Sequence, residues 1–240
     1  MTGSIDKPAL ILISAQAEWK AVKASCSPER LQQTPFGERF TATIAGKSCL
    51  FVQGGWGKIA AAASTQYAID RWRPGLIINL GTCGGFAGWV ERGTILLVER
   101  TVVYDILEQM TDPDEALEHY TTRLDLSWLR EPLPQPVWRG ALVSADRDLL
   151  PADINWLRER FGAVAADWES GAIAWVADRN GLRCLILRGV SDLVSSRGGE
   201  AYGAPEVFHT GTESVMRSLV AALPAWLRCA DGEAEPRNPL

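Results

Sequence analysis

Residues 163–194, AVAADWESGAIAWVADRNGLRCLILRGVSDLV, decide how we expect this chain to fold. A short apolar strand ends in Asp167-Trp168-Glu169, and apolar residues at helical spacing then lead to Gly181, which supplies a helix stop. The next segment, Leu182 to Val190, is almost continuously apolar, as is typical of a strand covered on both faces in a parallel sheet. The pattern therefore predicts a strand–helix–strand unit.

Such a unit closes with a right-handed crossover, so both strand ends emerge at the same edge of the sheet. That edge is where open α/β proteins bind their ligands. We therefore expect four polar residues from the two strand ends to converge there, although they lie apart in the sequence: Glu169, Arg188, Ser191 and Asp192.

The composition suits one large α/β domain. The chain has 240 residues, of which 47% are hydrophobic, and its net charge is -5 with acidic and basic residues interspersed. The sequence contains neither a basic run nor an apolar run long enough to span a bilayer, so it favours no nucleic-acid partner and no membrane partner. We predict one domain over residues 1–230, followed by a polar tail over residues 231–240.

The cysteines and histidines restrict cofactor and compartment. The five cysteines form no CxxC pair and have no metal-ligand spacing. Their odd number, together with the lack of a recognisable signal peptide, indicates the reducing cytoplasm. Because there are only two histidines, a histidine-rich metal site is not expected, and we predict neither a metal nor an organic cofactor.

Further elements are predicted around this unit. Ala9 to Ser14 is a buried strand, and Glu18 follows it near the start of a helix, where the helix dipole alone favours a carboxylate. We expect a hairpin over residues 40–52, strands over 94–104 and 139–145, and helices over 151–161 and 212–227. Residues 105–136 are interpreted as an excursion or partner-facing loop. Residues 195–205, which include Tyr202, are interpreted as a candidate lid.

Two glycine-rich segments follow predicted strands. Gly55-x-Gly57-x-x-Ala60 has the spacing of a dinucleotide fingerprint, but the next strand, Leu76 to Leu80, has no acid at its end to bind a ribose. We interpret the first segment as a tight turn that lets the backbone approach a neighbour. The second, residues 81–86, is predicted to be a turn that offers backbone N–H groups and the Thr82 hydroxyl to a small polar ligand. A plain turn role for Thr82 stays open.

Four segments, taken in order, resemble the nucleoside phosphorylase/nucleosidase superfamily, and within it the 5′-methylthioadenosine/S-adenosylhomocysteine nucleosidases. They are Ser14 to Glu18, residues 55–62 with 77–85, Asp167 to Ala174, and Arg188 to Asp192. Each segment is weak alone, whereas four in register are specific to the superfamily. The resemblance implies a single-domain three-layer α/β/α sandwich around a central mixed, mostly parallel sheet.

The resemblance also implies hydrolysis of the bond between ribose and purine. At the matching positions, Glu18 activates the attacking water, Glu169 binds the ribose and Asp192 protonates the base. These residue types suit the chemistry, because a carboxylic acid whose pKa is raised enough to keep its proton can neutralise the departing purine at N7. A carboxylate at the ribose hydroxyls favours the oxocarbenium-like state, and another can orient water on the opposite face of the sugar.

The same comparison assigns the remaining substrate-binding residues, which are Trp168, Thr82, Arg188, Ser191, Asp148, Leu149 and Tyr202. Arg188 and Thr82 are expected to hold the water near Glu18. Ser191 is expected to orient the carboxyl group of its neighbour Asp192. Structural roles stay open for Arg188 and for the catalytic candidate Asp192. Arg188 could form an ion pair with Glu169 or Asp192, and Asp192 could cap a loop.

The reaction type and the substrate are decided separately. Phosphate needs an arginine-rich cradle, which is missing after the first strand, and Glu18 would repel it, so the sequence favours water over phosphate. Trp168 stands where the methylthioadenosine enzymes usually have methionine, and Asp148 stands near a phenylalanine that lies beside the base. These departures could reshape the 5′ pocket and alter the choice of base. Methylthioadenosine or adenosylhomocysteine stays the leading substrate from the resemblance, and futalosine or another purine nucleoside comes next.

Several alternatives stay open. They are a futalosine hydrolase, because the Glu18-Trp19 pair is also similar to that group, a phosphate-dependent phosphorylase, and a nucleoside-binding protein without catalysis. The resemblance further implies a homodimer or a higher homo-oligomer. In that assembly, the segment from Tyr104 to His119, with Ile106, Leu107 and Met110, completes the pocket of a neighbouring copy.

Overall fold

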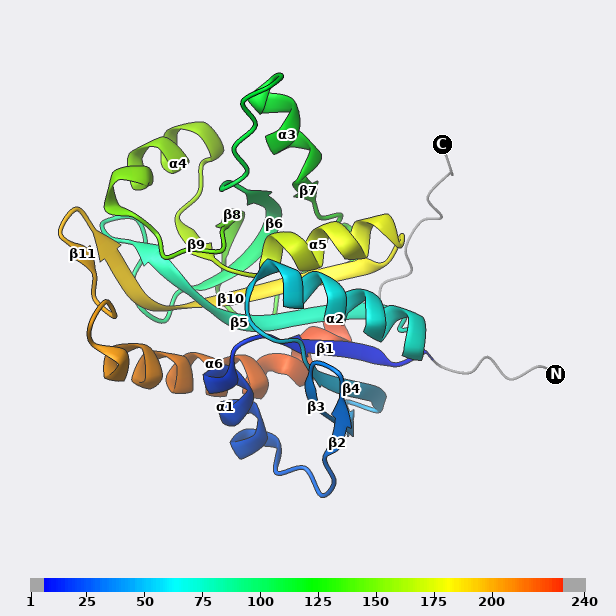
Figure 1. Cartoon of the computed structure of the whole chain (residues 1–240). Helices are drawn as coiled ribbons and strands as arrows, with labels where there is room; N and C mark the ends of the chain where they lie inside the picture. Colours follow the sequence, from blue (N-terminus) through cyan, green and yellow to red (C-terminus); the bar gives the residue numbers. More distant parts are fainter. Residues whose placement is uncertain (1–6, 231–240) are drawn as a thin grey trace.

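Strands β5 (Leu76–Phe86) and β10 (Arg183–Ser195) run side by side through the centre of the protein (Figure 1). The computed structural model describes residues 7–230, so the predicted polar tail over 231–240 lies outside the described residues. The two strands are parallel and stay paired from Leu76 beside Arg183 to Phe86 beside Val194. Alternate residues point to opposite faces of a sheet, so these two strands supply apolar side chains to both faces.

One mixed sheet contains all the strands of the described residues. Besides β5 and β10 they are β1 (Ala9–Ile13), β2 (Gln32–Thr34), β3 (Gly37–Ile44), β4 (Lys47–Gln53), β6 (Ile95–Val103), β7 (Thr121–Arg123), β8 (Trp138–Ser144), β9 (Ala165–Asp167) and β11 (Gly198–Gly199). The order is β11-β10-β6-β8-β9-β5-β1-β4-β3-β2, and β7 pairs with β6. Because β10 pairs with both β5 and β6, the strands β5, β9, β8, β6 and β10 form a closed ring.

Helices cover both faces of this sheet (Figure 1). On one face lie α1 (Gln16–Cys26) and α6 (Pro205–Cys229), and on the other lie α2 (Gly57–Trp72) and α5 (Ser170–Arg179). Ile78 and Leu187 pack with α6, whereas Ile77 and Ile186 pack with α2 and α5. The three-layer α/β/α sandwich predicted from the sequence is therefore confirmed.

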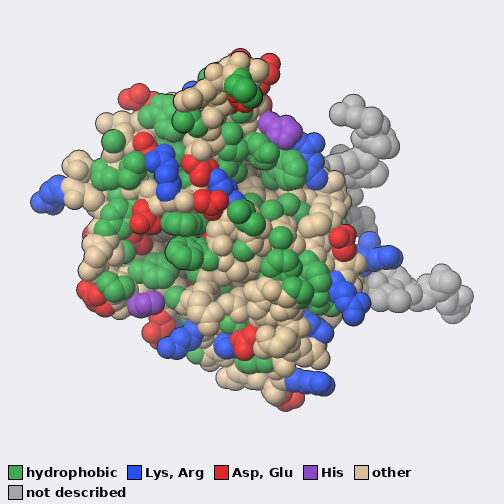
Figure 2. Space-filling model, in the orientation of Figure 1, with side chains coloured by type: hydrophobic (Ala, Val, Ile, Leu, Met, Phe, Trp, Pro, Cys, Tyr) green, Lys and Arg blue, Asp and Glu red, His purple; other side chains and the backbone are tan. Residues whose placement is uncertain are grey.

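Two shorter helices, α3 (Pro113–His119) and α4 (Ile154–Phe161), complete the fold, and a short 3₁₀ turn, Pro151–Asp153, precedes α4. The excursion expected over residues 105–136 thus contains α3 and β7. None of the helices between residues 7 and 230 has the length and apolar character needed to cross a bilayer. Figure 2 shows acidic and basic side chains intermixed on the displayed face, in keeping with the interspersed charges of the sequence.

Three predictions about the central strands and the last helix are wrong. First, β9 is antiparallel to β5 while β10 is parallel to it, so the segment around α5 is not a parallel crossover. Second, residues 81–86 form no turn, because β5 continues through them to Phe86 while hydrogen-bonded to β10. Third, the last helix begins at Pro205 rather than at Thr212, so its first turns reach over the ends of the central strands. A proline suits this first helical position because it has no N–H that needs a partner there.

Candidate active site

An opening along one edge of β5 creates the site. Strand β10 pairs with one edge of β5 along its whole length. On the opposite edge, β1 pairs with β5 as far as Asn79, and β9 pairs with β5 from Gly84. Between the ends of β1 and β9, residues 80–83 pair with no described strand on this edge, although β10 pairs with them on the other edge. Buried backbone groups left open in this way need partners from side chains.

Glu18 supplies partners for this opening from the first turn of α1. Its Oε1 accepts hydrogen bonds from the Thr82 backbone N–H at 2.6 Å and from the Thr82 hydroxyl at 2.8 Å. Its Oε2 accepts from the backbone N–H of Ala15 at 3.0 Å, which closes a capping contact at the start of the helix. Glu18 is 2% exposed and still borders the cavity described below. It therefore both caps α1 and presents a fixed carboxylate to a ligand.

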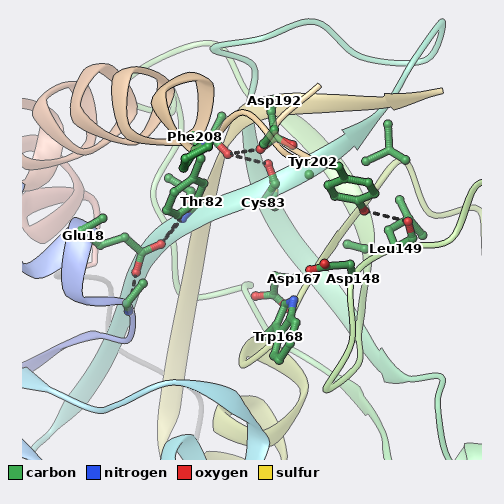
Figure 3. Close-up of a pocket in the computed structure, with 18 of the residues that line it drawn as sticks. Glu18, Thr82, Cys83, Asp148, Leu149, Asp167, Trp168, Asp192, Tyr202 and Phe208 are labelled. Atoms are coloured by element: carbon green, nitrogen blue, oxygen red, sulfur yellow. Dashed lines mark hydrogen bonds between the residues drawn. The ribbon is translucent and has the colours of Figure 1, made fainter. Parts of the chain in front are cut away.

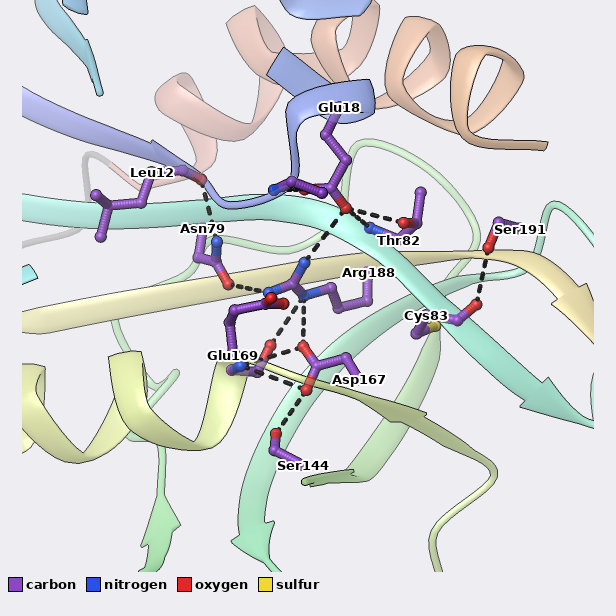
Figure 4. Close-up of polar contacts among 12 residues, drawn as sticks. Leu12, Glu18, Asn79, Thr82, Cys83, Ser144, Asp167, Glu169, Arg188 and Ser191 are labelled. Atoms are coloured by element: carbon purple, nitrogen blue, oxygen red, sulfur yellow. Dashed lines mark hydrogen bonds and ion pairs between the residues drawn. The ribbon is translucent and has the colours of Figure 1, made fainter. Parts of the chain in front are cut away.

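Arg188 lies beneath this opening and is fully buried, with 0% of its surface exposed (Figure 4). Its Nε donates to Ser170 Oγ at 2.8 Å and lies 3.0 Å from Asp167 Oδ2, while its Nη2 donates to Asn79 Oδ1 at 2.7 Å. The remaining nitrogen, Nη1, has no hydrogen-bond partner and lies 3.7 Å from Glu18 Oε1. One corner of the guanidinium group is thus left open beside the carboxylate.

Arg188 does not line the cavity itself. It sits in the middle of β10, beside Gly81 of β5, rather than at a strand end. A Cβ atom on Gly81 would lie 1.7 Å from Arg188 Nη1, so glycine is required at that position for the guanidinium group to fit. The ion pair of Arg188 at hydrogen-bond distance is with Asp167, whereas the sequence suggested Glu169 or Asp192.

Glu169 follows β9 and is held from the opposite side of the cavity. Its Oε1 accepts a hydrogen bond from the backbone N–H of Gly57 at 3.0 Å, where the chain enters α2. Burial raises the pKa of the Glu169 carboxyl group to about 8 against the attraction of Arg188, and the charges of Asp167 and Glu18 push it in the same upward direction. Gly57 has a φ of 84°, so the turn that aims this N–H group at Glu169 needs glycine.

Asp192 is the third acidic residue of the site, and its neighbour Ser191 holds it in place. A register shift between Val190 and Asp192 brings Asp192 beside Gly84, whose other neighbour is Ala166 of β9. The hydroxyl of Ser191 donates to Asp192 Oδ1 at 2.7 Å. Burial raises the pKa of the Asp192 carboxyl group even though this hydrogen bond opposes the rise, which favours a proton on Asp192.

One cavity of about 600 Å³ joins these groups (Figure 3). Glu18 and Asp192 lie at the two ends of the short segment formed by Thr82 and Cys83. The predicted residues that border the cavity are Glu18, Thr82, Asp148, Leu149, Trp168, Glu169, Ser191, Asp192 and Tyr202. The structure therefore brings together every predicted site residue, with Arg188 behind the wall.

The remaining wall is partly aromatic. The rings of Trp168 and Trp56 stack with centroids 4.9 Å apart. Tyr202 reaches across from the segment between β11 and α6, and its hydroxyl donates to the backbone carbonyl of Leu149 at 2.7 Å. The exposed Asp148 borders the cavity next to Leu149. The expected lid segment thus touches the opposite wall.

Several lining residues were missed from the sequence. Trp56 stands between two glycines with φ of 84°, and this Gly-Trp-Gly pattern was a usable signal. Phe208 and His209 lie in the first turns of α6, where no helix was expected. Asp167 received no role, although it directly precedes two positions that were assigned. Within residues 7–230, no group of three or more His, Cys, Asp and Glu side chains has the arrangement of a metal site.

The family description of the phosphorylase superfamily matches residues 9–223, which is most of the chain. The chain belongs to the phosphorylase superfamily. Among members of this superfamily, the 5′-methylthioadenosine/S-adenosylhomocysteine nucleosidase of Halalkalibacterium halodurans is 27% identical over 200 residues, which cover 76% of this chain and 83% of that protein. The nucleosidase of the same name from Tolumonas auensis is 24% identical over 203 residues, which cover 80% of this chain and 86% of that protein.

Solved structures of nucleosidases have the same fold. The Helicobacter pylori 5′-methylthioadenosine/S-adenosylhomocysteine nucleosidase with butyl-thio-DADMe-Immucillin-A has a TM-score of 0.77 and 15% identity, covering 92% of this chain and 100% of its own. The Streptococcus pneumoniae nucleosidase with the transition-state inhibitor MT-ImmA has a TM-score of 0.72 and 20% identity, and the match covers 93% of this chain and 100% of that one. At these identities the likeness concerns the fold.

Proposed function

We propose that this chain is a hydrolase that cleaves the N-ribosidic bond of a purine nucleoside, with 5′-methylthioadenosine and S-adenosylhomocysteine as its leading substrates. The observation that carries this proposal is the placement of three buried carboxyl groups, Glu18, Glu169 and Asp192, around one cavity of about 600 Å³. A site that only binds a nucleoside has no need for a carboxylate held beside the open N–H of Arg188, so the arrangement supports catalysis.

The proposed reaction uses the three acids in different protonation states. Glu169, when ionised, accepts hydrogen bonds from the ribose 2′- and 3′-hydroxyls. Asp192 carries a proton and gives it to N7 of the purine as the bond to C1′ breaks, so that the base leaves without a negative charge. Water held between Glu18 and the open Nη1 of Arg188 attacks C1′ and gives its proton to Glu18. The products are the free base and the 5′-substituted ribose.

Charge favours water over phosphate as the attacking group. Arg147 and His209 are the only cationic or imidazole side chains among the described residues that line the cavity. Arg147 is bound to Asp153 at 2.8 Å, and Arg188 is fully buried against Asp167. A phosphate dianion would therefore meet the Glu18 carboxylate without a free arginine to neutralise it.

The substrate assignment rests on the relatives. Curated superfamily members at 23–27% identity are named as 5′-methylthioadenosine/S-adenosylhomocysteine nucleosidases. One solved neighbour is a variant of the Helicobacter pylori enzyme with 5′-methylthioadenosine in its active site. The stacked Trp56–Trp168 pair and the carboxylate of Asp148 give this cavity an indole wall and an acceptor, which keep futalosine and other purine nucleosides as the second candidates.

The test is a panel of nucleosides incubated with the protein in the presence and absence of phosphate. The panel contains 5′-methylthioadenosine, S-adenosylhomocysteine, adenosine, inosine and futalosine, and chromatography detects the free base. We expect adenine from the first two without phosphate. Strict dependence on phosphate would establish a phosphorylase, and no base from any nucleoside would leave a binding protein.

Assembly and compartment are also proposed. Leu107 and Met110 are 80% and 90% exposed in the segment that the superfamily resemblance assigns to a neighbouring copy, which supports a homodimer or a higher homo-oligomer. Light scattering coupled to size exclusion tests this assembly. All five cysteines are free, which suits the reducing cytoplasm.

A further inference from the structure

Asp167 is a buried acid at the end of β9 that the proposed reaction does not use directly. It is 6% exposed and borders the cavity. Its Oδ1 accepts from the Ser144 hydroxyl at 2.5 Å, and its two oxygens face the Ser170 backbone N–H at 3.3 and 3.1 Å. Its Oδ2 also lies 3.0 Å from Arg188 Nε. Every one of these contacts is a donor, so the carboxylate is fixed in one orientation.

This orientation fixes the guanidinium group in turn. Asp167 holds Arg188 at Nε, and Asn79 holds it at Nη2 with an amide that is itself anchored to the backbone carbonyl of Leu12 at 3.1 Å. The backbone at Gly81 closes the space behind Nη1. A planar guanidinium group held at two corners has no freedom left at the third. The open Nη1 therefore points to one place, which is next to Glu18 Oε1 (Figure 4).

We propose that Asp167 is a positioning residue for the attacking water: by holding Arg188 at Nε, it aims the free Nη1 at the place beside Glu18 where the water is bound. This inference rests on the proposed hydrolysis and adds a residue to it. An unpaired N–H group in a fully buried side chain is costly, and a water molecule that bridges Nη1 and Glu18 removes this cost. In this proposal Asp167 acts on the water through Arg188.

The charge of Asp167 has a second effect on the same site. Burial is the main cause that raises the pKa of Glu169 to about 8, and the negative charge of Asp167 raises it further. An uncharged residue at position 167 removes this contribution and leaves the attraction of Arg188 in place, so Glu169 should ionise at lower pH.

The test compares Asp167→Asn with the wild-type protein in two measurements that do not depend on the amount of folded enzyme. The first is the ratio of methyl 5-methylthioriboside to 5-methylthioribose formed from 5′-methylthioadenosine in dilute methanol. A loosened water site should discriminate less strictly between water and methanol, so we expect this ratio to rise about threefold or more. We also expect kcat to fall about 10- to 100-fold while KM changes little. The second is the pH midpoint of proton release when formycin A, a C-nucleoside that is not hydrolysed, binds in the calorimeter. We expect this midpoint to move to lower pH.

Asp70→Asn is the matched control, because Asp70 lies exposed on α2 and accepts a hydrogen bond from Gln66 one turn away. It should keep the wild-type ratio and midpoint. If Asp167→Asn does not fold, Ser144→Ala removes one donor to the carboxylate and keeps its charge, and it should raise the methanol ratio without moving the midpoint. A wild-type ratio in an active Asp167→Asn protein, or in Ser144→Ala where that variant replaces it, would overturn the inference. A wild-type protein that releases no base overturns the proposed function instead.

Discussion

Replacement of Asp192 by asparagine should separate binding from chemistry. The change removes the proton that we assign to the departing purine, and it keeps the side chain almost isosteric. The amide of the asparagine would still offer an oxygen to the Ser191 hydroxyl, which donates to Asp192 Oδ1 at 2.7 Å in the wild-type protein. Because Asp192 is 6% exposed and fixed beside Gly84, the cavity should keep its shape. Binding of the nucleoside should therefore change only a few-fold.

The expected loss of turnover follows from the role of a general acid. Proton transfer by a positioned side chain contributes about 10²- to 10⁴-fold, which corresponds to about 3 to 5 kcal/mol in the activation free energy. We expect kcat for adenine release from 5′-methylthioadenosine to fall by this factor in single-turnover experiments with chromatographic detection. The dissociation constant of formycin A, measured by calorimetry, should stay within a few-fold of the wild-type value.

Stability provides the control for this variant. The folded-state pKa of Asp192 is raised by burial, so the contribution of this acid to stability is present below its unfolded pKa and is lost as the pH rises through the folded pKa. Asparagine does not titrate, so the variant should melt no lower than the wild type at pH 8. A fall of less than about tenfold in kcat, in a variant that binds and melts normally, would refute general acid catalysis by Asp192.

Three further variants and one wild-type experiment test other parts of the site. In the wild-type protein, binding of a ribose diol should release close to one proton at pH 7, because Glu169 has a pKa of about 8 and ionises when it accepts the hydroxyls. Calorimetry in buffers of different ionisation enthalpy measures this proton release. The variant Glu169→Gln should abolish it. Gly81→Ala places a methyl group 1.7 Å from Arg188 Nη1, so kcat should fall about 100-fold or more, and retained activity would show that the guanidinium group can move aside. Tyr202→Phe removes the donor to the Leu149 carbonyl, so KM should rise by a few-fold with kcat nearly unchanged, and a loss confined to kcat would contradict a closing role.

The sequence predicted which acids meet, but the physical reason was different. We expected Glu169 and Asp192 to meet at the ends of two parallel strands. In the structure they meet because β9 and β10 lie on opposite edges of β5 at Gly84, where Ala166 and Asp192 are its two neighbours. A three-residue strand such as β9 has too short a pattern to reveal its direction from the sequence.

The glycine cluster after Leu80 shows where pattern reading fails. Glycines between apolar residues indicated a turn, yet the chain stays extended there. The structure gives two of these glycines different reasons: a Cβ at Gly81 would collide with Arg188, and one at Gly85 would lie 2.7 Å from Val190 Cγ1. Glycine inside a strand marks the close approach of a neighbour, and this reading was available for the segment. It would have placed a large side chain against Gly81.

The role of Asp167 could not be predicted from the sequence, because it depends on a contact across the sheet. Asp167 and Arg188 are on strands that do not pair directly with each other. They meet only because the ring of five strands closes behind the opening. Long-range closure of this kind leaves no local pattern, whereas the capping position of Glu18 in the first turn of α1 does.

The charges around Arg188 explain how one site can favour water as the nucleophile and also stabilise a positively charged sugar. Three carboxyl groups, those of Asp167, Glu18 and Glu169, interact with this one guanidinium group. The cluster is therefore negative even when Glu169 holds a proton, and in the proposed reaction it becomes more negative when Glu169 ionises to accept the ribose hydroxyls. Negative charge fixed in a buried site stabilises the positive charge that develops on the ribose, and it disfavours an anionic nucleophile at the same place. Neutral water experiences no such repulsion, so the charge that lowers the barrier for bond cleavage also selects the nucleophile.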